Sequence, residues 1–349
     1  MTFRLFLIAL VTLLLLSIGC SRRFRLSDEQ LALPSAWPFH RGSIQGLGSV
    51  ESDSFSGRLN ILWEKRIGDK PAGPLTISHG ALIYPGSRRK VRFFGQVGGD
   101  YLGHWRAKRS VQTGLVMLDS LAYYGTALPY ERLCCIDLIH RRRVWRQRVK
   151  DAAAGTIIID DRLIVASSSG LLQAFDAYDG NLLWSLEVEG RLVAGPTCDA
   201  EKVYQPVDNG TLLAVAVEDG QELFRVELPE PLAASVAVDD MIYVSGVHGT
   251  VFALDSDDGH VVWQTSLGGD AWTAPTVLDG RLFVGLSSGE LVALQSTTGE
   301  ELWRFQTVEV VRASAAAIGK FVVVGTMGGK LFCLDAATGT VVDQRQMDG

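Results

Sequence analysis

The sequence predicts an all-β fold, a β-propeller of four-stranded blades, and three observations support this prediction. A segment of about forty residues recurs along most of the chain, each copy divides into four short strand-like pieces, and an aromatic residue ends nearly every copy. The clearest copies are LQAFDAYDGNLLW (172–184), VFALDSDDGHVVW (251–263) and LVALQSTTGEELW (291–303). Four strands in a repeat of this length are typical of a propeller blade.

The terminal aromatic residues set the register of the repeat. They are spaced 39 to 42 residues apart, and six of the eight tryptophans fall in this register, so chance is a poor explanation. Asp343 holds the position in the last copy. The predicted structural anchors are Trp63, Trp105, Trp145, Trp184, Phe224, Trp263 and Trp303.

The copy that ends at Trp303 shows the four pieces: TAPTVLDG, RLFVGLSSG, ELVALQSTTG and EELWRFQT. Glycine or Asp-Gly separates them, as hairpin turns with positive φ require. The strands are apolar on both faces, which suits sheets covered on each side by neighbouring sheets. Open solenoids and paired sandwiches fit less well, because solenoid repeats are shorter and sandwich strands lack a fixed long period.

Seven blades are predicted from the sets of strands that end between Trp105 and Asp343. Trp63 lies in an additional segment of outer-strand type, ILWEKRIG. We expect this N-terminal strand to pair with the last blade and close the ring. Eight blades are the alternative, if residues 37–60 contribute strands of their own.

The N-terminus has the pattern of an export signal. Arg4 precedes the apolar run Leu5–Leu16, which is too short to span a bilayer comfortably, and Gly19 stands before Cys20. This end resembles the lipobox of bacterial lipoproteins, with Ser17 where that motif usually has leucine. The resemblance implies a signal peptide over 1–19 and lipid attachment at Cys20. An ordinary signal peptide and a single-pass anchor are the alternatives.

Three segments follow: the signal peptide, a lipid-anchored tether over 20–56, and the propeller over 57–349. Ser21 is compatible with retention at the outer membrane, facing the periplasm, and inner-membrane anchoring is the alternative. Charge is divided unevenly, with a net +13 over residues 1–150 and −19 over 151–349. Such a split orients a protein towards an anionic surface or partner, or reflects drift among solvated residues.

The pattern Ala-Leu-Asp-x-x-Thr-Gly-x-x-x-Trp resembles the repeat of the pyrroloquinoline-quinone (PQQ) type propellers. The best copies are Ala174–Trp184, Ala253–Trp263 and Ala293–Trp303, and WPFHRGS (37–43) is similar to the lead-in of many of these proteins. One branch of the superfamily comprises dehydrogenases that hold PQQ and calcium. The other comprises non-enzymatic lipoproteins similar to the outer-membrane assembly component BamB. The BamB-like branch is the closer in kind.

The stretch LCCIDLIHRRRVW (133–145) tests the dehydrogenase branch, whose members carry a disulfide between adjacent cysteines. It aligns without gaps to residues 291–303, so Cys134 and Cys135 occupy strand positions. Consecutive side chains of a strand point to opposite faces, which predicts small buried cysteines rather than a disulfide. No catalytic, cofactor-binding or metal-binding residues are predicted, because the six histidines are scattered and the turn DSDDG (255–259) fits a hairpin.

The first two copies depart most from the repeat, over 85–104 and 120–132, and irregular loops on a rigid scaffold commonly carry binding. They combine arginine with aromatic residues, as interface anchors do. The turn at 141–143 has three arginines where other copies have glycine. The candidate partner-binding residues are Arg88, Arg89, Arg92, Phe93, Phe94, Tyr123, Tyr124, Arg141, Arg142 and Arg143.

The leading hypothesis is a non-catalytic envelope lipoprotein, a monomeric propeller without cofactor that acts as a protein-binding scaffold. Its partners would be envelope proteins, with the outer-membrane β-barrel assembly machinery as the named candidate, the membrane reached through the lipid and no nucleic acid bound. One alternative is a PQQ- and calcium-dependent quinoprotein oxidoreductase. Another is a ligand-sensing or glycan-binding propeller.

Overall fold

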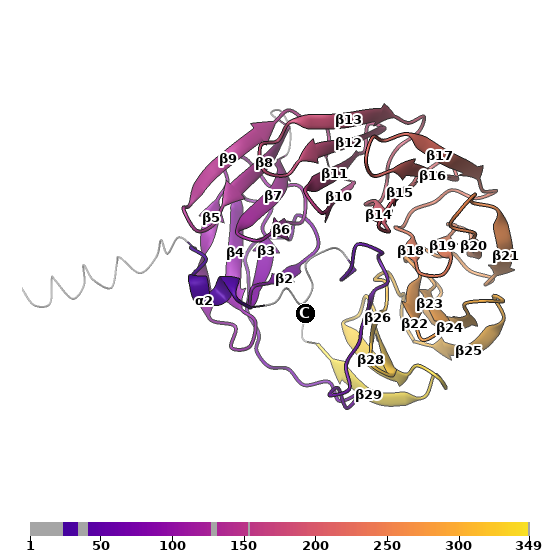
Figure 1. The fold of residues 1–349 in the computed structure, drawn as a ribbon. Coiled ribbons are helices and arrows are strands. Elements are labelled where there is room, and N and C mark those ends of the chain that lie inside the picture. The colour runs from indigo at the N-terminus through magenta and orange to yellow at the C-terminus, as the bar shows by residue number, and fades with distance from the viewer. Residues whose placement is uncertain (1–23, 34–40, 127–130, 153, 348–349) are drawn as a thin grey trace, which may run out of the picture.

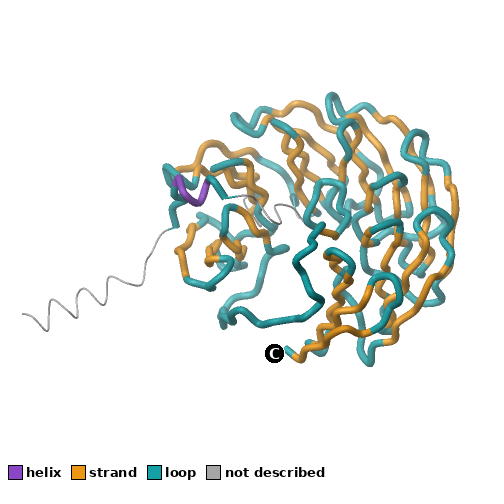
Figure 2. The backbone as a smooth tube through the Cα atoms, turned by 60° about the horizontal axis from the view of Figure 1, so that its bottom comes forward, coloured by secondary structure: helices purple, strands orange, loops and turns teal. Residues whose placement is uncertain are grey.

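Seven antiparallel sheets are arranged around a ring in the computed structural model, which describes residues 24–33, 41–126, 131–152 and 154–347 (Figure 1). The predicted all-β propeller with seven four-stranded blades is thereby confirmed. Strands and loops make up nearly all of the described chain (Figure 2). One short helix, α2 (Asp28–Leu31), lies beside the first blade. No helix among the described residues is long and apolar enough to cross a membrane.

Each of the first four blades uses four consecutive strands. Blade 1 has β2 (Thr76–Ser78), β3 (Ala81–Pro85), β4 (Lys90–Gly95) and β5 (Tyr101–Arg106). Blade 2 has β6 (Val116–Leu118), β7 (Leu121–Thr126), β8 (Arg132–Asp137) and β9 (Arg142–Gln147). Blade 3 has β10 (Gly155–Ile159), β11 (Arg162–Ser167), β12 (Leu171–Asp176) and β13 (Leu182–Glu187), and blade 4 has β14 (Thr197–Cys198), β15 (Lys202–Pro206), β16 (Thr211–Ala216) and β17 (Glu222–Glu227).

The other three blades repeat this order. Blade 5 has β18 (Ala237–Val238), β19 (Ile242–Ser245), β20 (Thr250–Leu254) and β21 (Val261–Ser266); blade 6 has β22 (Thr276–Leu278), β23 (Arg281–Gly285), β24 (Glu290–Gln295) and β25 (Glu301–Gln306); blade 7 has β26 (Ala316–Ile318), β27 (Phe321–Gly325), β28 (Lys330–Asp335) and β29 (Val341–Gln346). A further strand, β1 (Ser49–Val50), pairs in parallel with β26.

Every blade shifts register between its third and fourth strands. In six blades the shift falls after a small residue of the repeat, for example at Ala174 in blade 3 and Ala293 in blade 6, and Cys135 holds the same place in blade 2. In blade 1 Phe93 holds this place. A bulge at this point turns the outer strand relative to its neighbour. The recurring small residue of the sequence motif therefore marks a buried bend in blades 2 to 7.

The hydrophobic core lies between the blades rather than at the centre of the ring. Six clusters of buried side chains fill the six seams from blade 1 to blade 7. The seam between blades 2 and 3, for example, contains Tyr123, Cys135 and Leu163. Both faces of a blade are thus covered, which explains why its strands are apolar on both sides.

The seam between blades 7 and 1 is bridged by the N-terminal segment. Phe55 packs edge-on against Phe321 of blade 7, and Asp343 accepts a hydrogen bond from the Leu59 N–H at 2.8 Å. Trp63 packs near Phe94 of blade 1. The expectation that the segment around Trp63 pairs as an outer strand of the last blade is wrong, because β29 already occupies that edge and residues 57–70 form no strand. The N-terminal strand that joins blade 7 is instead β1, at its inner edge.

The two copies that depart most from the repeat, over 85–104 and 120–132, contain more regular strand than the sequence predicts. Residues 90–95 and 101–106 form β4 and β5, and 121–126 form β7, so these stretches are blade strands rather than loops. The predicted tether over 20–56 is described only in part. Within that part, Phe24 and Leu26 are buried between blades 1 and 2, so the chain packs on the blades well before residue 57.

Candidate functional site

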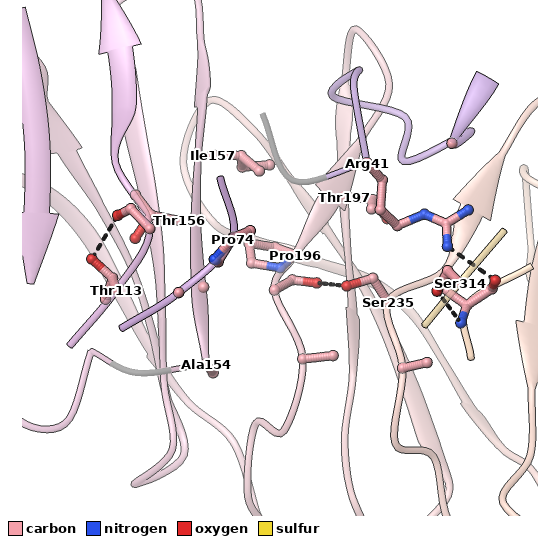
Figure 3. Close-up of a pocket in the computed structure, with 18 of the residues that line it drawn as sticks. Arg41, Pro74, Thr113, Ala154, Thr156, Ile157, Pro196, Thr197, Ser235 and Ser314 are labelled. Atoms are coloured by element: carbon pink, nitrogen blue, oxygen red, sulfur yellow. Dashed lines mark hydrogen bonds between the residues drawn. The ribbon is translucent and has the colours of Figure 1, made fainter. Parts of the chain in front are cut away.

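The central channel is a cavity that could carry function. It has a volume of about 550 Å³ and is lined by the inner ends of all seven blades (Figure 3). The lining is mostly glycine, alanine, serine, threonine and proline, as in the segments 72–74, 193–197 and 312–316. Its charged residues are Arg41 and Arg312, and no carboxylate is among the described lining residues.

Residues 41–50 form a strap across the inner edges of four blades. Its carbonyls accept hydrogen bonds from one backbone N–H in each of blades 4 to 7, at Cys198, Val238, Val277 and Ala317, each at 2.9 Å. Arg41 holds this strap in place, because its buried guanidinium donates to the carbonyls of Gly46 and Ala274 and to that of Pro275. Burial lowers the pKa of Arg41 to about 9, and the ring of carbonyl acceptors stabilises the charged form.

The channel does not fit the cofactors of a quinoprotein. Calcium in proteins is held by several oxygen ligands, carboxylates prominent among them, and the described channel lining offers no carboxylate. Cys134 and Cys135 are free and buried, and they face opposite seams of blade 2. Burial raises the pKa of both thiols, to about 12 for Cys135, so neither is a reactive thiolate at neutral pH.

A repeated lock joins the blades at their outer strands. The indole of Trp184 donates to the carbonyl of Val217 in the next blade at 3.0 Å, and Gly220 lies against its ring. A Cβ at Gly220 would come within 2.6 Å of the ring, and φ is +73° there, so only glycine fits. The same geometry recurs at Trp63, Trp145, Trp263 and Trp303, and Phe224 packs against Gly259 in the same way.

The seam between blades 1 and 2 departs from this pattern. Arg141 stands where the lock requires glycine, with a φ of +56°. The carbonyl of Leu138, which would accept from Trp105, instead accepts from the N–H of Leu26 at 3.2 Å. Phe24 stacks on Phe93 with ring centroids 3.8 Å apart. Trp105 therefore does not form the lock; it packs against the edge of this seam, and its indole N–H donates to the hydroxyl of Tyr124 at 3.4 Å.

The displaced tryptophan lines the second cavity, of about 940 Å³, which we call the basic seam cavity. Trp105, Tyr124, Thr126 and Cys134 form its uncharged lining. No carboxylate is among the described residues that line it. Its eight cationic residues are Arg106, Lys108, Arg109, Arg132, Arg141, Arg142, Arg143 and Arg146.

The structure separates the predicted partner-binding residues into two groups. Phe93, Phe94 and Tyr123 are buried in the core, which corrects the expectation that they present a surface, and Tyr124 is also buried but lines the basic seam cavity. Arg88 and Arg89 are exposed on the β3–β4 turn. Arg141, Arg142 and Arg143 are exposed and line the basic seam cavity. Phe24, Leu26 and Arg41 lie outside the repeat and were not predicted as site residues; only the lead-in WPFHRGS (37–43), which contains Arg41, pointed to that part of the chain.

Arg92, another of the predicted partner-binding residues, is held by Asp69. Its Nη1 lies 3.2 Å from the Asp69 carboxylate, which also accepts from Ser87 and is almost wholly buried. Burial acts to raise the pKa of Asp69, but the hydrogen bonds from Ser87, Arg92 and the Arg88 N–H outweigh it and lower that pKa below its ordinary value of 3.8. Arg92 is thus paired with Asp69 within the protein rather than free to bind a partner.

Asp69→Asn is expected to lower the free energy of unfolding by about 1–3 kcal/mol at neutral pH, because hydrogen bonds to a charged acceptor are lost. A carboxyl whose pKa is depressed by folding stabilises the fold above its unfolded pKa, and this contribution disappears as pH falls through 3.8 and below. Urea unfolding at pH 7 and pH 3 measures both effects. The difference between the two proteins should shrink at pH 3, and an equal difference at both values would contradict the assignment.

The turn at 255–260 brings Asp255, Asp258 and His260 together at the surface. Asp258 accepts from the His260 backbone N–H at 2.9 Å and lies 2.7 Å from its Nδ1, and Asp255 accepts from the Asp257 N–H. These contacts hold the hairpin in shape. Nothing else at this exposed turn points to a metal ion.

The Trp-locked, four-stranded blades define the class of protein as a PQQ-type β-propeller. Within this class, the chain belongs to the family described as outer membrane protein assembly factor BamB, whose model matches residues 131–238 and 208–349. The family resemblance seen in the sequence is therefore confirmed.

Individual relatives are distant. The outer membrane protein assembly factor BamB of Yersinia pestis is 24% identical over 135 residues, which is 34% of this chain and 34% of that protein. The chain thus matches about a third of the length of the curated relative. Among solved structures, BamB from Moraxella catarrhalis superposes with a TM-score of 0.69 at 19% identity, over 82% of this chain and 90% of that chain.

A europium-containing methanol dehydrogenase superposes with a TM-score of 0.78 at 11% identity, over 91% of this chain and 86% of that chain. Likeness at this identity concerns the fold alone. The dehydrogenase and the assembly factor share the blade architecture, so the side chains of each site decide between their functions.

Proposed function

We propose that this protein is a non-catalytic scaffold of the cell envelope that assists the assembly of outer-membrane β-barrel proteins. The observation that carries the proposal is the family match over residues 131–349, in a family described by that role. The channel lining supports the non-catalytic part, because it lacks the carboxylates that a calcium–quinone site needs.

The location belongs to the same proposal. Residues 1–19 act as the signal peptide, Cys20 carries the lipid, and the propeller faces the periplasm from the outer membrane. Cys20 and the signal peptide lie outside the described residues. The lipobox-like sequence and the family description support this placement.

One exposed apolar patch offers a surface for a protein partner. Val308 and Val310 precede β26, and Met327 lies in the next turn of blade 7, where its N–H donates to the Val310 carbonyl. Val308 is 89% exposed and Met327 is 68% exposed. Single exposed apolar side chains are ordinary, but adjacent ones on rigid loops are typical of interaction sites. We assign the docking of the assembly machinery to this patch.

The test is an envelope pull-down with the lipidated protein after crosslinking, with captured proteins quantified by mass spectrometry. We expect β-barrel assembly components in the wild-type capture, and an approximately tenfold loss with Val308→Asp plus Met327→Asp, about 1.4 kcal/mol in binding. Val97→Asp is the matched control, because Val97 is 79% exposed but lies in blade 1.

Two results would count against the proposal. Capture that lacks barrel-assembly components in the wild type rejects the scaffold role. Equal losses with the patch variant and with Val97→Asp reject the assigned surface. Added PQQ and calcium should leave the absorbance spectrum equal to the sum of the components, and a bound quinone would restore the oxidoreductase hypothesis.

A further inference from the structure

The basic seam cavity concentrates positive charge at one place between blades 1 and 2. Eight arginine and lysine side chains line it, and no carboxylate is among its described lining residues. Asp137 lies beside the arginine turn, but it already accepts from the N–H groups of Ile139 and His140 and contacts His140 Nδ1 at 2.6 Å. Arg142 Nε approaches it only to 3.9 Å. The cavity therefore presents a net positive field to solvent.

This charge is tied to a rebuilt seam rather than spread at random over the surface. Arg141 occupies a left-handed position that glycine fills in the locks at Gly180, Gly220, Gly299 and Gly339. In those locks a Cβ at the glycine would come within 2.6 Å of the tryptophan ring, so a side chain such as that of Arg141 is incompatible with the lock. Arg141 thus adds a cation to the cavity lining where other blades have glycine, and Trp105 adds an aromatic ring to the same lining.

The side-chain chemistry favours phosphate. Guanidinium groups present planar pairs of N–H donors that match phosphate oxygens, and seven of the eight cationic residues are arginines. Trp105 and Tyr124 supply amphipathic rings of the kind that lie at the level of lipid headgroups.

The path of the chain favours a membrane as the source of the phosphate. The N–H of Phe24 donates to the carbonyl of His104 in the outer strand of blade 1, so the N-terminal segment meets the propeller at this same seam. Cys20 stands four residues earlier, which an extended chain spans in about 14 Å. The inference that this seam lies close to a membrane rests on the lipid attachment at Cys20 proposed above. Arg22 and Arg23 lie in the intervening sequence.

We propose that the basic seam cavity binds the phosphate groups of anionic phospholipids and orients blades 1 and 2 towards the membrane. Clustered arginine and lysine next to a lipid anchor are attracted to anionic headgroups and respond to salt. The arginine turn thereby receives a ligand different from the protein partner that the sequence predicts for it.

The experiment measures binding of the full chain carrying Cys20→Ser, so that no acyl chain contributes. Co-sedimentation compares vesicles of phosphatidylcholine with vesicles that also contain phosphatidylglycerol. The apolar N-terminal run contributes equally to both, so the difference reports the anionic headgroup. We expect at least tenfold tighter binding to the anionic vesicles, weakened by added salt.

Two variants with the same change in charge locate the site. Arg142→Gln, Arg143→Gln and Arg146→Gln together are expected to remove most of the preference for anionic vesicles. The control, Arg88→Gln, Arg89→Gln and Lys90→Gln, changes three exposed cations outside the cavity and should keep the preference within about twofold. Because all six side chains are exposed, equal thermal unfolding of the two variants checks that the fold is unchanged.

Equal losses in both variants would reduce the effect to overall charge and overturn the proposal. Absence of any preference for phosphatidylglycerol overturns it as well. Binding of polyglutamate with no binding of vesicles would assign the cavity to an acidic polypeptide instead, whereas competition by millimolar inorganic phosphate supports a phosphate site. The pull-down described above tests the patch at Val308 and Met327, whereas the vesicle experiment tests the basic seam cavity. Failure of the scaffold role and failure of this site are therefore distinguishable.

Discussion

Trp184→Ala is expected to lower the free energy of unfolding by about 3–5 kcal/mol, the range for removing a large buried aromatic side chain. Trp184 is buried in the seam between blades 3 and 4, against Leu172 and Val215. Its indole N–H also satisfies the Val217 carbonyl, which would lose its donor. The loss combines a cavity with an unpaired buried acceptor.

Urea-induced unfolding followed by far-ultraviolet circular dichroism measures this effect. Trp105→Ala is the matched control, because it removes the same side chain at the same repeat position. Trp105 is only partly buried and faces the basic seam cavity, so we expect its loss to cost less than about 2 kcal/mol. Equal costs at the two positions would show that the lock at Trp184 has no special role.

The repeat made the blade fold predictable because each blade uses the same local physics. A positive φ at glycine, a bend at a small residue and an indole that reaches the next blade recur at fixed spacing, and each leaves a mark in the sequence. Gly220 and Ala214 serve blade 4 as Gly299 and Ala293 serve blade 6. The tryptophan register therefore identified the blades without any knowledge of their packing.

The site was less predictable because segments outside the repeat contact the seam where it lies. Phe24 and Leu26 donate hydrogen bonds to His104 and Leu138, which lie 80 and 112 residues further along the chain, and no periodicity reports such contacts. The aromatic residues predicted to bind a partner illustrate a second limit. Phe93 and Tyr123 have the composition of a binding surface, yet strand pairing turns them into the core. Composition alone does not decide which face a side chain occupies.

Trp63 illustrates both the predictable and the unpredictable part of the fold. Its position in the repeat correctly places its indole in a lock, with the N–H donated to the Gln96 carbonyl at 3.0 Å and Gly99 against the ring. Its backbone nevertheless forms no strand, because blade 7 completes its own outer edge with β29. The anchor was predictable from spacing, whereas the pairing depended on the outer edge of blade 7, which β29 occupies.

Arg41→Met is expected to be the second severe change, with a loss of about 3–5 kcal/mol in the free energy of unfolding. Methionine retains much of the volume but donates no hydrogen bond, so the buried carbonyls of Gly46, Ala274 and Pro275 lose the donor they share. Each buried acceptor left without a partner costs about 1–3 kcal/mol. Arg191→Met, at an exposed arginine, is the control and should be nearly neutral.

The position of Arg41 also predicts where the damage appears. The strap over 44–50 protects the N–H groups of Val238, Val277 and Ala317, which lie in three different blades. In Arg41→Met these amides should exchange with solvent faster, whereas amides within the β12–β13 pairing, such as that of Ala174, should keep their protection. Uniform acceleration across all blades would contradict this expectation, because it would mean that Arg41 stabilises the ring as a whole rather than the strap that crosses its centre.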